Sequence, residues 1–471
     1  MKKSNNKLMS LTEKKLDKAL NDSIKDGAAF SAMDGITSTY STPFALALGA
    51  NNAEIGLLSS VPSLLITISQ TFAGKYIEKE GRKNVAENLS FIHKLIWLPI
   101  IFIPIYFLNE GVFLFILLLT FSNVILSFAN TAWFSWIGNI VPENIRGRYF
   151  GKRNTVQSAC SFVTTLLAGW ILGLTKNLLG FSVVFFLAFI FGIISYNYLT
   201  KIPEATSKEE DKNHKINVLD FMKDLKKYRN FHPFTIHMSL VSFAVNLASP
   251  FFTVYMLSVM KVGYEWYGII IATEVLTRIF MLRYWGKLAD KFGDRTIMIL
   301  CNILIVFYPF LFLFAVNTFQ LILISIFSGI AWSGFDLTSF NYLLDVTPIE
   351  KRPYYIANYK IYVGTALFLG PLIGGLLSIY LTNVTFLWLS GLQILFLLSF
   401  ILRGAATAYG LPKIKEVRVK NVLPVTDVFL KAFAVYPARG ITHDLVYVES
   451  RFQNMGKRIE KKFKNLKNLK R

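Results

Sequence analysis

The chain has few cysteines and few charged residues for its length. Only two cysteines occur in 471 residues, Cys160 and Cys301, and both fall within apolar stretches. A disulfide framework or a structural zinc site needs several cysteine or histidine residues at short spacings, so we predict no disulfide, metal or cofactor. Charged residues make up 17% of the chain, against about 25% in typical soluble domains. The composition therefore argues against an ordinary soluble protein.

Signatures of three other functional classes are also missing. The sequence has no Gly-x-x-x-x-Gly-Lys-Ser/Thr motif, which argues against ATP binding on this chain. No nucleophile with a nearby histidine occurs at the ends of the apolar segments, so we do not expect an enzyme. The formal net charge is +21, but the basic residues are spread through loops and tails. Because nucleic-acid binding needs basic residues gathered on one face, we expect no nucleic-acid partner.

Long hydrophobic segments dominate the sequence. Hydrophobic residues make up 53% of the chain, including 42 phenylalanines, and the segments have roughly the 20 residues that a helix needs to cross a bilayer. We therefore predict an all-α membrane protein with twelve transmembrane helices in two pseudo-symmetric halves, residues 27–200 and 231–403. The predicted spans are residues 27–49, 54–75, 84–108, 112–140, 148–174, 178–200, 232–259, 265–287, 296–316, 318–345, 353–380 and 384–403.

Three polar segments surround the predicted spans. Residues 1–26 carry aliphatic residues at i+4 spacing, which indicates an amphipathic helix on the membrane surface, with a frayed tail as the alternative. Residues 201–230 form a polar linker with a short amphipathic helix near Val218. Residues 404–471 form a tail with a basic end, and such a run favours contact with anionic lipid, or alternatively with a cytoplasmic protein partner.

The basic residues of the short loops predict the orientation. Four loops on one side contain 13 lysine and arginine residues, whereas the loops on the other side contain only Lys176 and Lys261. Basic loops stay in the cytoplasm. We therefore expect a multi-pass protein of the cell membrane, in direct contact with the lipid bilayer, with both termini in the cytoplasm.

Two polar loop sequences occur once in each half. The stretch GKYIEKEGRK starts at Gly74, and GKLADKFGDR starts at Gly286, 212 residues later. Glycine lets the backbone turn sharply and lets helices approach, and an acid among bases can hold a helix end. The residues that both copies keep are Gly74, Glu78 and Gly81 in the first, and Gly286, Asp290 and Gly293 in the second.

The second repeated loop begins with a proline. VPENIRGRYFGKRN starts at Val141, and TPIEKRPYYIANYK starts at Thr347, 206 residues later. Both copies place a proline at the end of one helix and an arginine, Arg146 or Arg352, at the entrance of the next. Two loops repeated at about half the chain length indicate two halves of the same construction, as in one large class of transporters.

The glycine-containing loop resembles the signature Gly-x-x-x-Asp-Arg/Lys-x-Gly-Arg-Arg/Lys of the major facilitator superfamily. The resemblance implies a fold of two six-helix halves and transport by alternating access. In that family the acid after helix 2 meets the start of helix 11 and helps to hold the cytoplasmic gate shut. By resemblance this role falls on Glu78 with Arg82, and in the second half on Asp290 with Arg295. Glu78 replaces the usual aspartate, and Asp294 stands where a base is expected.

By the same resemblance, Arg146 and Arg352 join a cytoplasmic charge network. Anchoring to lipid phosphate is the alternative interpretation of these two arginines. The fifth helix of drug/proton antiporters in the family carries a Gly-Pro-x-x-Gly-Gly signature. The fifth span here reads LLAGWILG and has no proline, so a drug antiporter is not specifically indicated. The eleventh span contains small residues from Gly364 to Gly375, which predict close helix packing.

Polar residues at helical spacing mark the faces that turn away from lipid. Span 1 has Asp34 and Ser38 within such a stripe, and span 7 has Asn246, in a stripe with the same spacing 208 residues later. In span 4 we predict Asn130 and Trp133 to face the same cavity. Packing between helices is the alternative interpretation for these polar residues.

Charged residues inside the predicted spans are the sharpest candidates for a transport pathway. Glu274 and Arg278 lie four residues apart on one face of span 8, and Asp336 lies in span 10. The pair is either a structural ion pair or a site for an anionic substrate or a proton. His93 and Lys94 lie at similar depth in span 3. Embedded carboxylates are costly, which suggests proton coupling through Asp34, Glu274 or Asp336.

Together these features predict a secondary active transporter that moves a small molecule by alternating access. An uncoupled facilitator stays open as an alternative, and so does a receptor or scaffold that keeps the helix bundle without transport. Export, including multidrug efflux across the plasma membrane, competes with nutrient uptake. Aromatic residues such as Trp133 fit flat or apolar substrates, but aromatic residues also pack in cores.

Overall fold

The structure is a computed structural model that describes residues 13–107, 110–204, 230–348, 351–382 and 384–417. The short helix predicted near Val218 and the basic end of the tail lie outside these residues. The helices of the first half are α1 (Glu13–Ala47), α2 (Asn52–Glu80), α3 (Arg82–Tyr106), α4 (Gly111–Ile140), α5 (Arg146–Thr175) and α6 (Leu178–Leu199). The second half has α8 (Phe231–Asn246), α9 (Ser249–Val254), α10 (Tyr264–Phe292), α11 (Asp294–Leu311), α12 (Thr318–Val346), α13 (Arg352–Leu381) and α14 (Gly391–Gly410).

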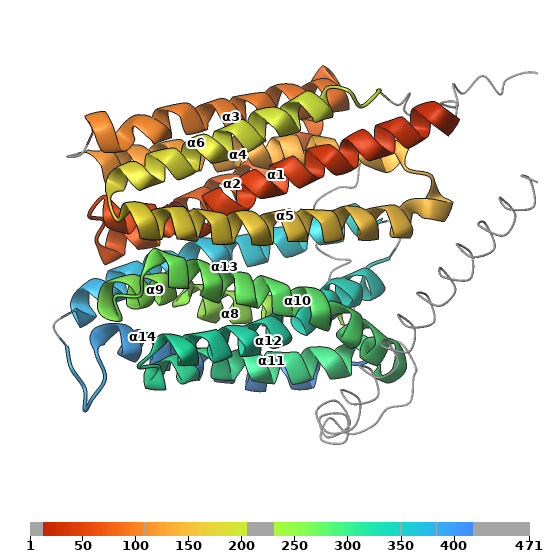
Figure 1. Ribbon diagram of the computed structural model, residues 1–471. Helices are drawn as coiled ribbons and strands as arrows, with labels where there is room; N and C mark the ends of the chain where they lie inside the picture. The colour runs from red at the N-terminus through yellow and green to blue at the C-terminus, as the bar shows by residue number, and fades with distance from the viewer. Residues whose placement is uncertain (1–12, 108–109, 205–229, 349–350, 383, 418–471) are drawn as a thin grey trace, which may run out of the picture.

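These helices confirm the predicted all-α membrane fold. Among the described residues, ten segments are long and apolar enough to span a membrane, and one of them is the continuous run of α8, α9 and a π-helical turn. The other two long helices are α1 and α10, which carry the polar and charged side chains of the predicted pathway. Figure 1 shows the two halves as two groups of roughly parallel helices, one above the other.

Three predicted boundaries differ from the structure by seven residues or more. Helix α1 is continuous from Glu13, so residues 13–26 extend the first span instead of forming a separate surface helix. The reason is burial, because Leu20 and Asp26 of this extension are packed inside the first half. The last span begins at Gly391, seven residues later than predicted, where Ser390 and Gln393 form a capping box. It continues to Gly410, into the predicted tail.

The glycine of the repeated loop adopts the same conformation in both halves. Gly81 has φ 88° between α2 and α3, and Gly293 has φ 92° between α10 and α11. Side chains disfavour positive φ, and glycine does not. Each glycine N–H also closes the preceding helix, with bonds of 3.0 Å to Ile77 O and 2.9 Å to Ala289 O. The sharp turn predicted from the sequence repeat is confirmed.

The second repeated loop is built alike in both halves. The Arg146 guanidinium donates to the carbonyl of Gly138 at 3.2 Å, and the Arg352 guanidinium donates to the carbonyl of Leu344 at 3.1 Å. In both cases the acceptor lies eight residues before the arginine, in the last turns of the preceding helix. A cation at a helix C-terminus is stabilised by the helix dipole and by otherwise unpaired carbonyls. Both arginines therefore hold a helix end in their own half.

Near the start of the first helix of each half, equivalent positions carry different kinds of side chain. In the first half, the Tyr149 hydroxyl donates to Ser23 at 2.7 Å, and an Arg153 nitrogen lies 3.8 Å from a carboxylate oxygen of Asp26. The positions 206 to 208 residues later are all aromatic. The second-half pairs are Phe231 with Tyr355, with ring centroids 4.7 Å apart, and Phe234 with Tyr359, at 5.9 Å. One half thus uses a buried polar network where the other uses ring packing.

The seventh span is interrupted between α8 and α9. Pro250 lacks the N–H that would continue the helix, and it disfavours a helical conformation at the preceding residue. The break leaves the carbonyl of Ala244 without its helical donor, because the N–H of Ala248 bonds to the carbonyl of Val245 at 3.3 Å instead. Ser399 of α14 donates to the carbonyl of Ala244 at 2.6 Å, and Arg403 donates to that of Val245 at 3.4 Å. Ser399 therefore replaces the missing helical hydrogen bond, and Arg403 gives the carbonyl of Val245 a second donor.

Arg403 serves a second interrupted helix as well. Pro309 in α11 cannot donate to the carbonyl of Ile305, and Arg403 Nη1 bonds this carbonyl at 2.9 Å. The guanidinium is 1% exposed and lies over the Tyr308 ring, 6.0 Å from its centroid. The buried guanidinium of Arg403 thus joins α14 to α8 and α11 through one carbonyl of each.

We predict that Arg403→Met destabilises the protein by about 1–3 kcal/mol, because the buried carbonyl of Ile305 loses the donor that replaces the missing N–H of Pro309. Thermal unfolding in detergent measures the effect. Arg283→Met, at an exposed arginine of α10, is the control and should change stability by less than about 0.5 kcal/mol. Equal unfolding temperatures for the two variants would contradict the assignment.

Candidate functional site

The two halves meet along two helix pairs that cross at glycines. Helix α2 packs against α13, where a Cβ added to Gly56 would lie 2.6 Å from the carbonyl oxygen of Pro371 and 3.0 Å from the Cα of Gly375. Helix α5 packs against α10, where a Cβ added to Gly169 would lie 3.2 Å from the Cα of Gly268. Glycine permits this approach because it has no side chain. The close packing predicted for the small residues of the eleventh span is confirmed.

Two tyrosines close the space between the halves near these crossings. Tyr40 of α1 and Tyr267 of α10 meet edge to face, with ring centroids 5.9 Å apart. The Tyr40 hydroxyl donates to the carbonyl of Thr165 at 2.8 Å, and the Tyr267 hydroxyl donates to the carbonyl of Thr39 at 3.3 Å. Each hydroxyl is thus bonded to the backbone of the first half. We call the end of the bundle where α2 and α10 begin the closed end.

The opposite end of the bundle is open at the equivalent helices. A methyl group added to Gly74 of α2 or to Gly151 of α5 would meet no atom within 4 Å. In Figure 1, α5 and α10 lie close together on the left and diverge toward the right, where α1 and α5 begin. We call this end the open end.

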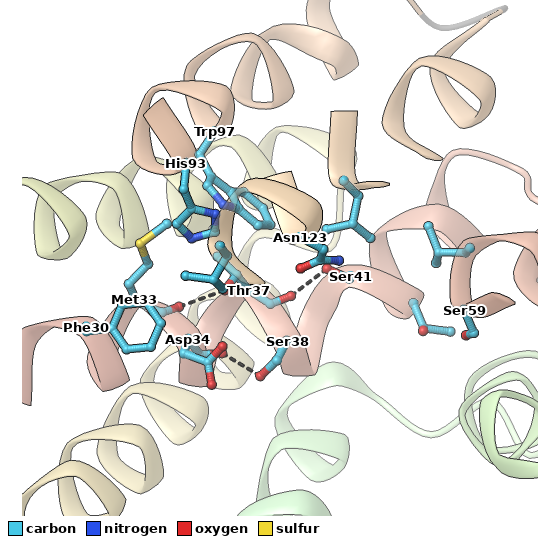
Figure 2. Close-up of a pocket in the computed structure, with 14 residues that line it drawn as sticks. Phe30, Met33, Asp34, Thr37, Ser38, Ser41, Ser59, His93, Trp97 and Asn123 are labelled. Atoms are coloured by element: carbon cyan, nitrogen blue, oxygen red, sulfur yellow. Dashed lines mark hydrogen bonds between the residues drawn. The ribbon is translucent and has the colours of Figure 1, made fainter. Parts of the chain in front are cut away.

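The first cavity lies within the first half and has a volume of about 230 Å³. It is lined by residues of α1, α2, α3 and α4, among them Asp34, Ser38 and Asn123. Figure 2 shows Asp34 and Ser38 on the side of α1 toward the green helices of the second half, with His93 and Trp97 on the opposite wall. The prediction that Asp34 and Ser38 face a cavity agrees with this geometry.

The hydroxyl groups of α1 in this cavity bond to their own helix. Ser38 donates to the carbonyl of Asp34 at 2.5 Å, Ser41 to that of Thr37 at 2.5 Å, and Thr37 to that of Met33 at 3.1 Å. Each hydroxyl hydrogen is therefore used, while the oxygen lone pairs stay available. The wall formed by α1 presents hydrogen-bond acceptors to the cavity.

His93 and Lys94, neighbours on α3, point in different directions. His93 lines the first cavity, and its Nδ1 lies 2.8 Å from the Ser122 hydroxyl of α4. The Lys94 ammonium is buried inside the half, where it donates to Ser90 at 2.6 Å and lies 5.7 Å from the centroid of the Tyr196 ring. Only His93 therefore belongs to the cavity.

The second cavity contains three charged side chains and has a volume of about 400 Å³. Arg278 of α10 forms an ion pair with Asp336 of α12, and its other nitrogen lies 3.9 Å from Glu274. The cavity also touches Ser158 of α5, so it lies on the boundary between the halves. The sequence predicted Glu274 and Arg278 on one face, which is confirmed. It did not predict Asp336 as the nearer partner, because that contact joins residues 58 positions apart.

The sequence profile of the Major Facilitator Superfamily matches residues 27–280 and 238–438. The chain belongs to this superfamily. An MFS-type transporter of Methanocaldococcus jannaschii is 27% identical over 284 residues, which are 60% of this chain and 71% of that protein. The quinolone resistance protein NorA of Staphylococcus aureus is 26% identical over 166 residues, 35% of this chain and 42% of that protein.

Solved structures of transporters share the fold. A mutant of the nucleoside transporter NupG has a TM-score of 0.69 at 15% identity, over 84% of this chain and 100% of that chain. A bacterial homolog of the human lysosomal transporter Spinster, in an inward-facing and unoccupied conformation, has a TM-score of 0.67 at 12% identity, over 89% of this chain and 99% of that chain. Membership of the superfamily makes the protein a multi-pass membrane transporter for a small molecule, and not an enzyme.

Three residues predicted for the pathway line neither cavity. The Asn246 amide donates to Ser242 O of its own helix at 2.8 Å, and a Cβ added to Gly370 of α13 would lie 3.0 Å from its Cβ. The Trp133 ring is buried, with the Arg153 guanidinium 4.1 Å from its centroid, so packing and not a substrate occupies this aromatic face. Asn130 is exposed on α4, outside both groups of lining residues.

The residues predicted to form gates lie at the open end. Glu78 is exposed in the last turn of α2, and Arg82 begins α3. Asp290 is exposed near the end of α10, and Arg295 donates to the carbonyl of Ile414 after α14 at 2.6 Å. Their role as a gate stays a prediction, since the halves are apart at this end.

We predict opposite effects for the same substitution at two glycines of α5. Gly169→Ala should destabilise the protein by about 1–3 kcal/mol, because the added methyl would lie 2.6 Å from the Tyr40 hydroxyl and 2.8 Å from the carbonyl of Tyr264. Gly151→Ala should be neutral or stabilising by up to about 1 kcal/mol, since it meets open space in a helix. Thermal unfolding of both variants is the measurement, and equal shifts would contradict the packing at the closed end.

Proposed function

We propose that this protein is a secondary transporter that moves its substrate by alternating access. The supporting observation is that cavities bearing Asp34 in one half and Arg278 in the other lie in a bundle closed at one end and open at the other. Rocking of the halves about these cavities would exchange the open and closed ends. The glycine crossings at the closed end would then separate as the open end closes.

In this proposal the repeated loops form the gate of the open end. Glu78 and Arg82 would approach the start of α13 when the halves close there, and Asp290 and Arg295 would approach the start of α5, the equivalent helix of the first half. Arg146 and Arg352 lie at the same end and already hold helix ends. Their guanidinium groups have further N–H donors, which can donate to a carboxylate in the closed state.

Proton coupling is the energy source that the charges favour. Asp34 lies in one cavity, and Glu274 and Asp336 share a single arginine in the other. Because charge without a counter-charge is costly away from water, protonation of one of these carboxylates would accompany closure. An uncoupled facilitator is the second candidate, and the ion pair of Arg278 with Asp336 favours it, since a closed pair needs no proton.

The basic loops support the orientation of the protein in the cell membrane. By the positive-inside rule they support a cytoplasmic position for the open end and for both termini. The structure then corresponds to an inward-open conformation. The match to a quinolone resistance protein supports export across the plasma membrane as the direction of transport.

We predict that Asp34→Asn and Glu274→Gln each lower proton-driven flux at least tenfold in proteoliposomes with an imposed proton gradient, because both remove a carboxylate that can carry a proton. Uptake and efflux of a panel of labelled metabolites and dyes measure this flux. Asp17→Asn, at an exposed residue of the same α1 helix, is the matched control and should keep full flux. Flux that depends on neither the gradient nor the two carboxylates would contradict coupling and leave a facilitator.

We predict that a membrane-impermeant maleimide labels a cysteine at Lys176 but not one at Lys287 in intact cells, with the native cysteines replaced. Lys176 caps the end of α5 at the closed end, and Lys287 lies in α10 toward the open end. Permeabilised cells, in which both positions should react, provide the control. The reverse labelling pattern would overturn the proposed orientation.

A further inference from the structure

We propose that the first cavity binds an organic monocation, such as a quaternary ammonium ion or a protonated amine, with Asp34 as the counter-ion. This inference rests on the proposed function, because it takes the cavity as part of the substrate pathway. It names the chemical class of the substrate, which the fold does not specify.

The charges that line the two cavities favour a cation. Three carboxylates, those of Asp34, Glu274 and Asp336, stand against the single guanidinium of Arg278, so the formal charge of the lining is −2. A cavity lined by one sign of charge attracts the opposite sign and repels the same sign. An anionic substrate would meet net repulsion at this depth in the bundle, where counter-charges are scarce.

Asp34 is the one of these three carboxylates that does not contact Arg278. The other two carboxylates engage Arg278, which forms an ion pair with Asp336 and lies 3.9 Å from a carboxylate oxygen of Glu274. Among the described residues, no lysine or arginine lies within ion-pair distance of Asp34. The Asp34 side chain is exposed to the cavity, so a ligand can reach it. A bound cation would supply the missing counter-charge.

The rest of the α1 wall also suits a cation. The hydroxyl hydrogens of Thr37, Ser38 and Ser41 are used in bonds to their own helix, so the hydroxyl oxygens face the cavity as acceptors. An ammonium ion offers N–H donors or polarised methyl groups to such acceptors. An anion would find no donor in these three groups.

Aromatic side chains add a specific contact for an alkylated ammonium ion. Phe30 lines the cavity one helical turn before Asp34, and Figure 2 shows its ring next to the Asp34 carboxylate along α1. An aromatic face attracts a cation within about 6 Å of its centroid. A carboxylate and a ring on the same face of one helix thus provide both the charge and the apolar surface that an organic cation needs.

Calorimetric binding to the purified full-length protein in detergent tests the inference, with benzyltrimethylammonium as the probe and benzenesulfonate as an anion of similar size. We expect saturable binding of the cation and none of the anion. Asp34→Asn should weaken cation binding at least tenfold through loss of the charged contact, and Phe30→Leu should weaken it by about two- to fivefold. Asp34→Glu keeps the charge and should stay within about threefold of wild type. Asp17→Asn is the control and should bind like wild type.

Equal affinity of wild type and Asp34→Asn, no cation binding by the wild type, or tighter binding of benzenesulfonate would each overturn the inference. Thermal unfolding of Asp34→Asn separates loss of binding from loss of the fold, and Asp34→Glu decides the matter if Asp34→Asn unfolds. The assay needs neither a gradient nor flux. Asp34-dependent binding without flux in liposomes would therefore refute the proposed transport alone, whereas flux of an anion without cation binding would refute this inference alone.

Discussion

The structure depends on one constraint of the bilayer, that polar backbone groups must find partners within the protein. Where prolines interrupt the seventh span and α11, Ser399 and Arg403 supply the missing donors. Where α4 and α12 end, Arg146 and Arg352 bond the last carbonyls. These side chains supply hydrogen-bond donors to backbone carbonyls at the helix ends and helix breaks. Other embedded charged groups have side-chain partners within the first half, as Asp26 and Lys94 do, or lie in the two cavities.

The two halves of the internal repeat share the conformation of their backbone turns but differ in their buried side chains. The turns at Gly81 and Gly293 are the same, because glycine alone tolerates the backbone conformation that both need. Side chains inside each half are free to diverge as long as they pack. The first half buries an ion pair of Asp26 and Arg153, and the second buries rings at the equivalent positions. The cavities diverge in the same way, one with a single carboxylate and one with a cluster of three charges.

Local patterns in the sequence predicted the spans, the glycine turns and the shared face of Glu274 and Arg278, because these depend on spacing along one helix. Contacts between distant helices were not predicted, since no periodicity encodes them. The partner of Arg278 lies on α12, and Trp133 is covered by an arginine of α5. The continuity of α1 also escaped prediction, because burial of Asp26 depends on Ser195 of α6, which donates to it at 2.8 Å. The sequence therefore indicated candidate residues, and packing decided which of them meet.

Alternating access requires the two halves to rock as units about the cavities. Double electron–electron resonance between spin labels on α5 and α10 measures this motion. The native cysteines are replaced, and the protein is held in lipid nanodiscs. One label pair, at Lys152 and Lys287, reports on the open end, and a second pair, at Leu174 and Trp266, reports on the closed end. Rocking predicts two populations at each end across a range of pH, with the first distance shortening as the second lengthens. A change at one end without the opposite change at the other would contradict it.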